Sequence, residues 1–313
     1  MSALDIDITL NTGAKIPAVG FGTVCFDEFK SQFKDALKAA LLEGHYRHID
    51  TAWYYGTEAL IGEVLQELFE SGKLKREDIF VTTKVWPSFW KDPLKSLEKS
   101  LHDLRLDYVD LFLQHWPLAF EGDENGLPAV PKDAEGNVKF AKGADYLSTW
   151  KKMILIYKNT TKTRAIGVSN YTPKMLTRLL KETDVVPATN QVELHPHLPQ
   201  VELVKFCKEH KIVVEAFSPL GGNGAPNLKI PLVQQLAKKY NVPAVDIIVN
   251  YHAQAGRVVL PRSQNVERIK KGFSEVKLTE KELAELDQFG IDHPKRFIND
   301  VWGNDLGFEH WGQ

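Results

Sequence analysis

The sequence predicts an α/β fold, a (β/α)8 TIM barrel, from two observations. Eight short apolar or β-branched runs alternate with segments whose apolar residues recur at helical spacing. Three successive runs also end in side chains that can do chemistry: Asp50 with Tyr55 shortly after it, then Lys84, then His115. Because strand ends of such a barrel meet on one face, we expect these four side chains to lie together.

Each expected strand is a short run bounded by turn or helix signals. In chain order the strands are Gly20–Thr23, Tyr46–Asp50, Ile79–Lys84, Val109–His115, Thr163–Val168, Ala188–Val192, Ile212–Ala216 and Val258–Pro261. The helices between them show apolar residues at three- and four-residue spacing. These helices cover Phe33–Leu41, Glu58–Glu70, Pro93–Leu104, Tyr146–Tyr157, Pro173–Leu180, Gln200–Glu209, Pro231–Tyr240 and Pro243–Gln254.

Elements outside the eight repeats complete the predicted domain. Ile6–Leu10 and Lys15–Val19 flank a turn and predict an N-terminal β-hairpin that caps one end of the barrel. Thr279 and Glu282 have the spacing of a capping box, which predicts an extra C-terminal helix followed by a tail. The polar segment Leu118–Ala144 is long for a loop, and such loops are often functional. We expect one domain over 1–313.

The composition excludes several classes of protein. The chain has 313 residues, 43% hydrophobic and 26% charged, with a formal net charge of −2. We therefore expect no nucleic-acid partner and no membrane partner. Cys25 and Cys207 form no disulfide framework and lack metal-ligand spacing, which favours a reducing compartment, the cytoplasm. No signal peptide or membrane-spanning run is expected.

Three polar features each allow a second interpretation. Asp50 could simply cap the following helix, with the neighbouring tyrosines packing in the core. The segment Arg262–Arg268 could be a solvated turn, or it could bind a phosphate monoester through its two arginines. His195 and His197 could belong to a metal site, although structural roles are favoured because nothing completes a ligand set. Neither a Gly-x-Gly-x-x-Gly fingerprint nor a P-loop is present.

Taken together, a series of short motifs resembles the aldo-keto reductases, in particular fungal reductases of aldehydes, ketones and glycerol-type substrates. The matching pieces run from about Leu10 to Leu286. They are Gly22-Thr23, His48-Ile49-Asp50-Thr51-Ala52, Tyr55-Gly56, Thr83-Lys84, His115-Trp116-Pro117, Gly167-Val168-Ser169-Asn170, Gln191-Val192-Glu193, Ser218-Pro219-Leu220-Gly221 and Pro261-Arg262-Ser263.

The resemblance implies hydride transfer from NADPH to a carbonyl carbon, with Tyr55 giving a proton to the oxygen. Lys84 is expected to lower the phenol pKa, Asp50 to orient Lys84, and His115 to hydrogen-bond the substrate oxygen. The resemblance also implies a set of cofactor-binding residues for NADPH/NADP+. They are Thr23, Ser169, Asn170, Gln191, Phe217, Ser218, Leu220, Arg262, Ser263, Asn265 and Arg268.

Strand-end position and resemblance together predict the pocket for a small-molecule carbonyl substrate. Its candidate walls are Val24, Tyr54, Trp86, Trp116, Phe120 and Trp302. Val24 stands where tryptophan is usual, which should widen the pocket. The tail Arg296–Trp302 is similar to the sugar-binding tail of xylose reductases, so an aldose (xylose-type) reductase is an alternative. A metal-dependent hydrolase and a non-catalytic barrel are further alternatives. A monomer or weak dimer is expected.

Overall fold

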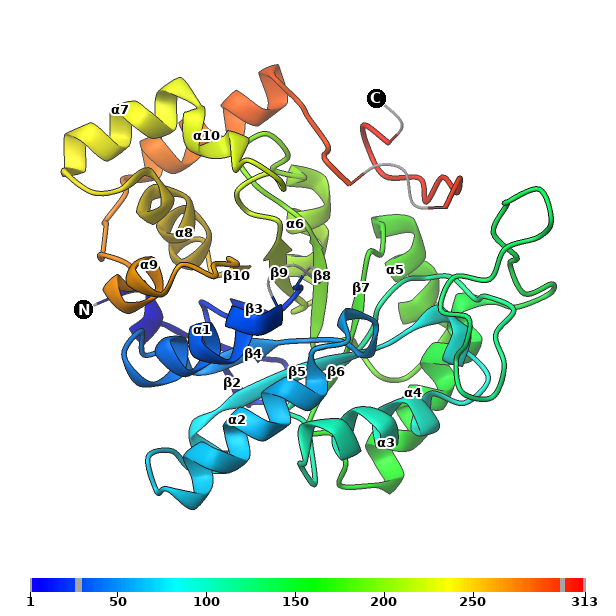
Figure 1. The fold of residues 1–313 in the computed structure, drawn as a ribbon. Helices are drawn as coiled ribbons and strands as arrows, with labels where there is room; N and C mark the ends of the chain where they lie inside the picture. The colour runs from blue at the N-terminus through cyan, green and yellow to red at the C-terminus, as the bar shows by residue number, and fades with distance from the viewer. Residues whose placement is uncertain (1, 26–29, 299–301, 312–313) are drawn as a thin grey trace.

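A computed structural model describes residues 2–25, 30–298 and 302–311 of the chain. Within them, eight parallel strands follow one another in chain order around a single sheet. A parallel bridge between Val19 and Val259 joins the last strand to the segment that leads into the first, and Gly20 N donates to Val259 O at 2.9 Å. The sheet therefore closes into the predicted TIM barrel (Figure 1).

The strands are short and almost wholly buried. They are β3 (Phe21–Gly22), β4 (His48–Asp50), β5 (Phe80–Val85), β6 (Leu111–Gln114), β7 (Ile166–Ser169), β8 (Thr189–Glu193), β9 (Val213–Phe217) and β10 (Val258–Leu260). All eight expected strands are present, with ends displaced by at most three residues. Such small displacements are usual because strand ends depend on pairing rather than on local sequence.

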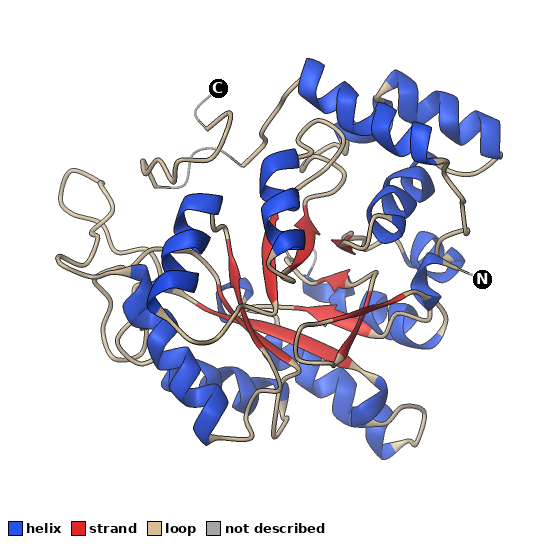
Figure 2. Ribbon diagram, turned by 180° about the vertical axis from the view of Figure 1, so that it is seen from behind, coloured by secondary structure: helices blue, strands red, loops and turns tan. Residues whose placement is uncertain are grey.

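Helices surround the strands, as the view from behind shows (Figure 2). They are α1 (Lys30–Leu42), α2 (Glu58–Glu70), α3 (Pro93–Leu104), α4 (Tyr146–Asn159), α5 (Pro173–Glu182), α6 (Val201–Glu209), α7 (Pro231–Tyr240), α8 (Ala244–Gln254), α9 (Val266–Lys271) and α10 (Glu280–Asp292). Short 3-10 turns lie between them: η1 (Ala3–Asp5), η3 (Trp53–Tyr55), η4 (Arg76–Asp78), η5 (Pro87–Phe89) and η6 (Pro226–Lys229).

The helix starts follow the capping rules. Asp92 accepts the amide N–H of Lys95 at 3.1 Å at the start of α3, and Thr279 forms the predicted capping box with Glu282. Gln200 was expected to be the first residue of helix six. It is instead the residue before α6, in a left-handed conformation, and its side chain donates to Glu193 O at 2.5 Å. The barrel therefore uses this side chain to connect α6 to the end of β8.

The hairpin of β1 (Asp7–Thr9) and β2 (Lys15–Pro17) covers the amino-terminal end of the barrel, as predicted. Its buried Leu10 and Ile16 pack in one cluster with Phe80, Leu111 and Val258, which lie at the starts of β5, β6 and β10. Apolar packing closes this end, so the carboxyl ends of the strands face the other way. The polar side chains predicted to be catalytic stand at those carboxyl ends.

Two irregular segments meet over the carboxyl-terminal end. The long loop folds back on itself through a bridge between Phe120 and Phe140, and Trp86 Nε1 donates to Ala129 O at 2.6 Å. The C-terminal tail contacts this loop, because the ring centroids of Phe120 and Trp302 lie 5.2 Å apart. In the described part of the chain, no helix combines the length and apolar character needed to cross a membrane.

Candidate active site

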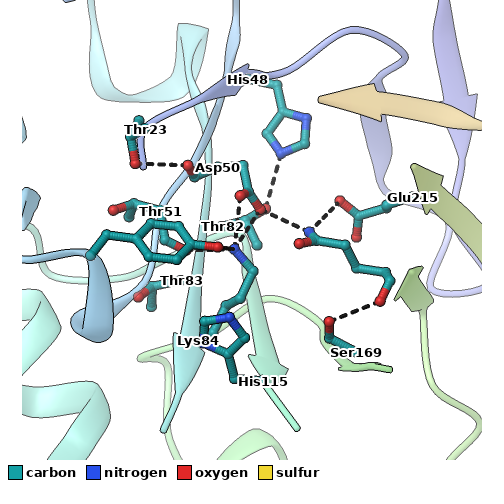
Figure 3. A network of polar contacts seen from close by, with 12 residues as sticks. Thr23, His48, Asp50, Thr51, Thr82, Thr83, Lys84, His115, Ser169 and Glu215 are labelled. Atoms are coloured by element: carbon teal, nitrogen blue, oxygen red, sulfur yellow. Dashed lines mark hydrogen bonds and ion pairs between the residues drawn. The ribbon is translucent and has the colours of Figure 1, made fainter. Parts of the chain in front are cut away.

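The side chain of Lys84 is at the centre of the site, and none of it is exposed. Its ammonium donates to both carboxylate oxygens of Asp50, at 2.8 and 2.9 Å, and to the carbonyl of Thr51 at 2.9 Å. It also donates to the phenol oxygen of Tyr55 at 3.2 Å (Figure 3). The structure thus brings together Asp50 from β4, Tyr55 from the η3 turn and Lys84 from β5, as the strand-end pattern predicted.

The charges in this cluster balance locally. Burial by itself would lower the pKa of Lys84, but the charge of Asp50 and the interaction with Tyr55 raise it above the ordinary value. Lys84 is therefore a cation at neutral pH, paired with the carboxylate of Asp50. A buried ion pair of this kind is tolerated because both ions have further hydrogen bonds.

Lys84 lowers the phenol pKa of Tyr55, as expected, but burial outweighs this effect. Burial raises the pKa of Tyr55, the charge of Lys84 lowers it, and the charge of Asp50 raises it again, so the net direction is upward. The sequence argument counted the lysine but not the desolvation of the half-buried phenol. A raised pKa keeps the proton on Tyr55 at neutral pH, so the residue begins as an acid.

His115 stands beside the phenol, with ring centroids 5.6 Å apart. Burial and the charge of Lys84 hold the pKa of His115 well below its ordinary value, so the imidazole is neutral. Its Nδ1 has no hydrogen-bond partner among the described residues. A neutral imidazole carries one N–H and one acceptor nitrogen, so this ring can donate to an oxygen beside Tyr55.

Three residues predicted to bind the nicotinamide amide lie close together, at the end of β7 and in the middle of β8. Asn170 donates from Nδ2 to His115 O at 3.0 Å and to Ser169 Oγ at 3.1 Å. Gln191 donates from Nε2 to Asp50 Oδ2 at 2.8 Å and to Glu215 Oε2 at 3.3 Å. Each amide nitrogen is thus engaged, so both side chains have a carbonyl oxygen left to offer a ligand. Two such acceptors suit the NH₂ of a carboxamide.

The remaining predicted cofactor residues line the exits of β3, β9 and β10. The Thr23 hydroxyl is buried and donates to Asp50 O at 2.9 Å, so its contact in the structure is with the neighbouring strand. Phe217, Ser218 and Leu220 are half-buried at the end of β9. Ser218 has a φ of 50°, which turns the chain sharply away from the strand.

The exit of β10 presents exposed cations. Arg262 and Arg268 are exposed, and Arg262 Nη1 donates to Val24 O at 3.1 Å. Asn265 caps α9, because its Oδ1 accepts the Arg268 N–H at 2.9 Å, and Ser263 Oγ accepts the Asn265 N–H at 3.2 Å. These caps fix the backbone that carries the two guanidinium groups.

Five of the six predicted pocket residues form one aromatic group. Tyr54 stacks on Trp86 at 3.6 Å, and Trp302 meets Trp86, Trp116 and Phe120 edge to face at 5.2–5.5 Å. The sixth residue, Val24, is 39% exposed and has no ring to join this group. Within the xylose-reductase-like tail, residues 299–301 lie outside the described part of the chain.

Two buried carboxyls were missed by the sequence reasoning. Glu58 accepts the Thr83 hydroxyl at 2.6 Å, and Glu215 faces the Gln191 amide, next to the Lys84 cluster (Figure 3). Burial is the largest cause that raises the pKa of each to about 7. A glutamate in the middle of the apolar run Val213–Ala216 was the available signal for Glu215. Glu58 looked like an ordinary first-turn helix residue.

The paired histidines after β8 have separate partners. His195 Nε2 lies 2.9 Å from Glu193 Oε1, and His197 Nδ1 lies 2.9 Å from His293 O. Among the described residues, no group of three or more metal-ligating side chains is arranged to hold an ion. These contacts of both histidines are hydrogen bonds to other parts of the fold.

The fold and the site together define a barrel oxidoreductase with a tyrosine–lysine–aspartate cluster at its strand ends. A family model for the aldo/keto reductase family matches residues 18–291. Aldehyde reductase YPR1 of Saccharomyces cerevisiae is 41% identical over 304 residues, with 95% of each chain covered. Glycerol 2-dehydrogenase (NADP(+)) of the same organism is 40% identical over 304 residues, with 94% of each covered.

A solved structure gives the same result. An aldo-keto reductase (AKR2E5) complexed with NADPH superposes with a TM-score of 0.82 at 33% identity, covering 94% of this chain and 90% of that one. The chain belongs to the aldo/keto reductase family. As a member of it, the protein is an NADPH-dependent oxidoreductase that reduces the carbonyl of aldehydes or ketones to an alcohol.

Proposed function

We propose that Asp50, Tyr55, Lys84 and His115 perform the chemistry of this reductase, with Tyr55 as the proton donor. The observation that carries the proposal is the position of Lys84 Nζ, which contacts the Asp50 carboxylate and the Tyr55 hydroxyl at once. When bound, NADPH supplies the hydride. The chain has to hold the carbonyl, orient it and deliver a proton to its oxygen.

Each residue has a separate part in the proton transfer. The Tyr55 phenol begins protonated, because burial raises its pKa. As negative charge develops on the carbonyl oxygen, that oxygen takes the phenol proton, and the cation of Lys84 stabilises the phenolate left behind. Asp50 keeps Lys84 charged and in place. The neutral His115 donates a hydrogen bond to the same oxygen and fixes its approach.

The residues around the site fit the predicted cofactor. The amide oxygens of Asn170 and Gln191, whose amide nitrogens are already engaged, match a carboxamide NH₂, and Ser169 is close enough to Asn170 to share in that contact. We assign the Phe217 ring to stacking on the nicotinamide, with Ser218 and Leu220 at the pyrophosphate and Thr23 at the adjoining strand end. These assignments follow from the family resemblance and from the positions of the residues on β9 and β3.

The adenosine 2′-phosphate is assigned to the exit of β10. Arg262 and Arg268 are exposed there, and guanidinium groups bind phosphate with two parallel hydrogen bonds. Ser263 and Asn265 add polar groups between them. Glu267 is the acid in this run, and its position next to Arg268 on α9 turns its side chain about 100° away.

The substrates that suit the pocket are small aldehydes and ketones with apolar or flat groups beside the carbonyl. Tyr54, Trp86, Trp116, Phe120 and Trp302 supply flat apolar surfaces, and Val24 leaves one side less crowded than a tryptophan would. Reduction of sugar aldehydes is the second candidate, because aromatic faces also pack on sugar rings. The alcohol-oxidising direction is suggested by the relative named glycerol 2-dehydrogenase.

We also propose that residues 1–313 act as one domain, in the cytoplasm, as a monomer or weak dimer. The closed barrel and the tail that packs against its loop support one domain. Both cysteines are buried and neither is in a disulfide within the described residues, which is compatible with a reducing compartment.

One assay separates the candidate functions. NADPH oxidation is followed with benzaldehyde, an aliphatic ketone and D-xylose, with and without a metal chelator. We expect chelator-insensitive turnover that is highest with the aldehyde. Turnover only with xylose would favour the aldose reductase, and chelator-sensitive hydrolysis without NADPH oxidation would contradict the proposal.

A further inference from the structure

Glu215 is a fully buried acid that the proposed chemistry does not use. It lies in the middle of β9, and its Oε2 accepts from Gln191 Nε2 at 3.3 Å. The same amide nitrogen donates to Asp50 Oδ2 at 2.8 Å. Hydrogen bonds thus run without a gap from Tyr55 through Lys84, Asp50 and Gln191 to Glu215.

The surroundings of Glu215 disfavour its negative charge. Its Oε1 has no hydrogen bond of ordinary geometry within the described residues. Burial is the largest cause that raises its pKa to about 7, and the charge of Asp50 adds to it. Thr189 and Gln191 from β8 and the cation of Lys84 from β5 offset part of the rise. On the other side, β10 pairs the uncharged Val258 with Glu215.

An additional cation close to Gln191 would stabilise the negative charge of Glu215. Lys84 cannot provide it, because its ammonium is already held by both oxygens of Asp50. The oxidised nicotinamide ring carries a positive charge, and the reduced ring carries none. The Gln191 amide links Glu215 to the place assigned to that ring, and interactions between charges are strong in a dry interior.

We propose that Glu215 is a charge-compensating residue of the cofactor site, whose carboxylate favours NADP+ over NADPH. The inference rests on the proposed placement of the nicotinamide against Gln191. Binding of NADP+ stabilises the ionised form of Glu215, which therefore gives its proton to the solvent. Binding of NADPH has no such effect. The acid thereby adjusts the relative occupancy of the site by product and reactant cofactor.

Proton release is the property to measure. Suppose that bound NADP+ lowers the Glu215 pKa by one unit from about 7. Roughly 0.4 proton per protein molecule is then released at pH 7. The affinity for NADP+ then increases by up to about tenfold as the pH rises from 5.5 to 8. Both cofactors carry the 2′-phosphate. Any proton that this phosphate releases to the solvent when it binds the arginines therefore cancels in the difference between NADP+ and NADPH.

The experiment is calorimetric titration of NADP+ and of NADPH in buffers of different ionisation enthalpy, from pH 5.5 to 8. We expect proton release for NADP+ in excess of that for NADPH, and loss of this excess in Glu215→Gln. Glu58→Gln is the matched control, because Glu58 is equally buried with its pKa also about 7 but contacts Thr83 instead of Gln191. The control should keep the excess.

A failure of the role of Glu215 can be distinguished from a failure of the assigned nicotinamide position. Equal proton release for both cofactors in the unmodified enzyme contradicts the role of Glu215, even if the variant does not fold. An excess that survives in Glu215→Gln contradicts it too. If Gln191→Leu leaves the affinity for both cofactors unchanged, the assigned nicotinamide position is wrong and the proposed site fails with it.

Discussion

The buried cluster around Lys84 and the exit of β10 both carry charge for the same reaction, under opposite physical conditions. At the cluster, Asp50 and Lys84 are sealed between strands and held at 2.8 Å. At the exit, Arg262 and Arg268 stand in solvent on a loop and a short helix. Charges interact strongly in a dry interior and are screened by water and salt at a surface.

Because one region is buried and the other is exposed to solvent, the two regions have separate functions. A buried cluster can shift pKa values and stabilise a transient phenolate, because no water reorganises around it. An exposed pair of arginines can capture a phosphate and select one cofactor, but it lies too far into solvent to affect proton transfer. Changes in the cluster should therefore alter turnover or pH dependence, and changes at the exit should alter cofactor affinity.

The largest effect is expected from Tyr55→Phe. The variant lacks the hydroxyl that donates the proton, while the residues assigned to NADPH lie on other strands. Turnover of an aldehyde should fall by at least the roughly 10²–10⁴-fold typical of a lost general acid. Steady-state kinetics with NADPH provide the measurement, and near-normal turnover would remove Tyr55 from this role.

The next largest effect is expected on the pH dependence of the free energy of unfolding, and it is caused by Glu58. Its folded-state pKa is about 7 against an ordinary 4.5, so the folded protein binds this proton more tightly than the unfolded chain does. The contribution of protonated Glu58 to the free energy of unfolding is therefore complete below about pH 4.5, and it is lost as the pH rises through 7. A shift of this size corresponds to about 3 kcal/mol.

Glu58→Gln has no charge to bury, so it should not suffer this loss. Between pH 5 and pH 8, the free energy of unfolding of the variant should improve relative to the unmodified protein by up to about 3 kcal/mol. Urea unfolding at the two pH values measures the change. Parallel pH curves for the two proteins would show that Glu58 ionises normally.

The sequence predicted which residues form the cluster around Lys84 better than it predicted their pKa values. Asp50, Lys84 and His115 were found because each ends a strand, and strand ends of a barrel share one face. Glu215 was missed because a strand run gives no indication of what its charged residue will face. The effect of Lys84 on the Tyr55 pKa was predicted, but the net upward direction was not, because the desolvation of a side chain depends on contacts that only the folded chain makes.

The tail shows a second limit. Glu193 accepts the backbone N–H groups of Phe297 and Ile298 at 2.7 and 2.9 Å, and these contacts attach that part of the tail to the end of β8. No local pattern links residues a hundred positions apart. Only the family resemblance placed Trp302 in the pocket, and the structure brings its ring against Trp86 and Trp116.

At the exit of β10, Arg268→Ala should weaken NADPH binding by about 10- to 150-fold, the equivalent of a roughly 1.5–3 kcal/mol hydrogen bond to a charged group. NADH should be nearly unaffected, because it lacks the 2′-phosphate. Lys271→Ala is the control, since it removes an exposed cation from the other end of α9.

Fluorescence titration of NADPH and of NADH into each variant measures these affinities. Arg262→Ala should follow the same pattern less cleanly, because Arg262 also donates to Val24 O. Equal losses of NADPH and NADH affinity in both arginine variants would make these residues structural and move the phosphate site elsewhere.

The smallest effect is expected at the pocket wall. Val24→Trp adds a large ring at a position that is 39% exposed beside the site. Bulky ketones should lose more of their kcat/KM than small aldehydes, because the ring narrows only one side of the pocket. The kcat/KM values of a bulky ketone and of a small aldehyde provide the comparison, and an equal proportional change for both would exclude Val24 as a wall.

The most direct test measures two quantities in two variants, Tyr55→Phe and Arg268→Ala. NADPH affinity is determined by titration, and the rate of one turnover is determined at saturating NADPH. We expect Tyr55→Phe to bind NADPH normally but react at least about 10²-fold more slowly, and Arg268→Ala to bind weakly but react at nearly the unmodified rate. If both variants lose affinity and rate together, the buried cluster and the exposed exit do not have separate tasks.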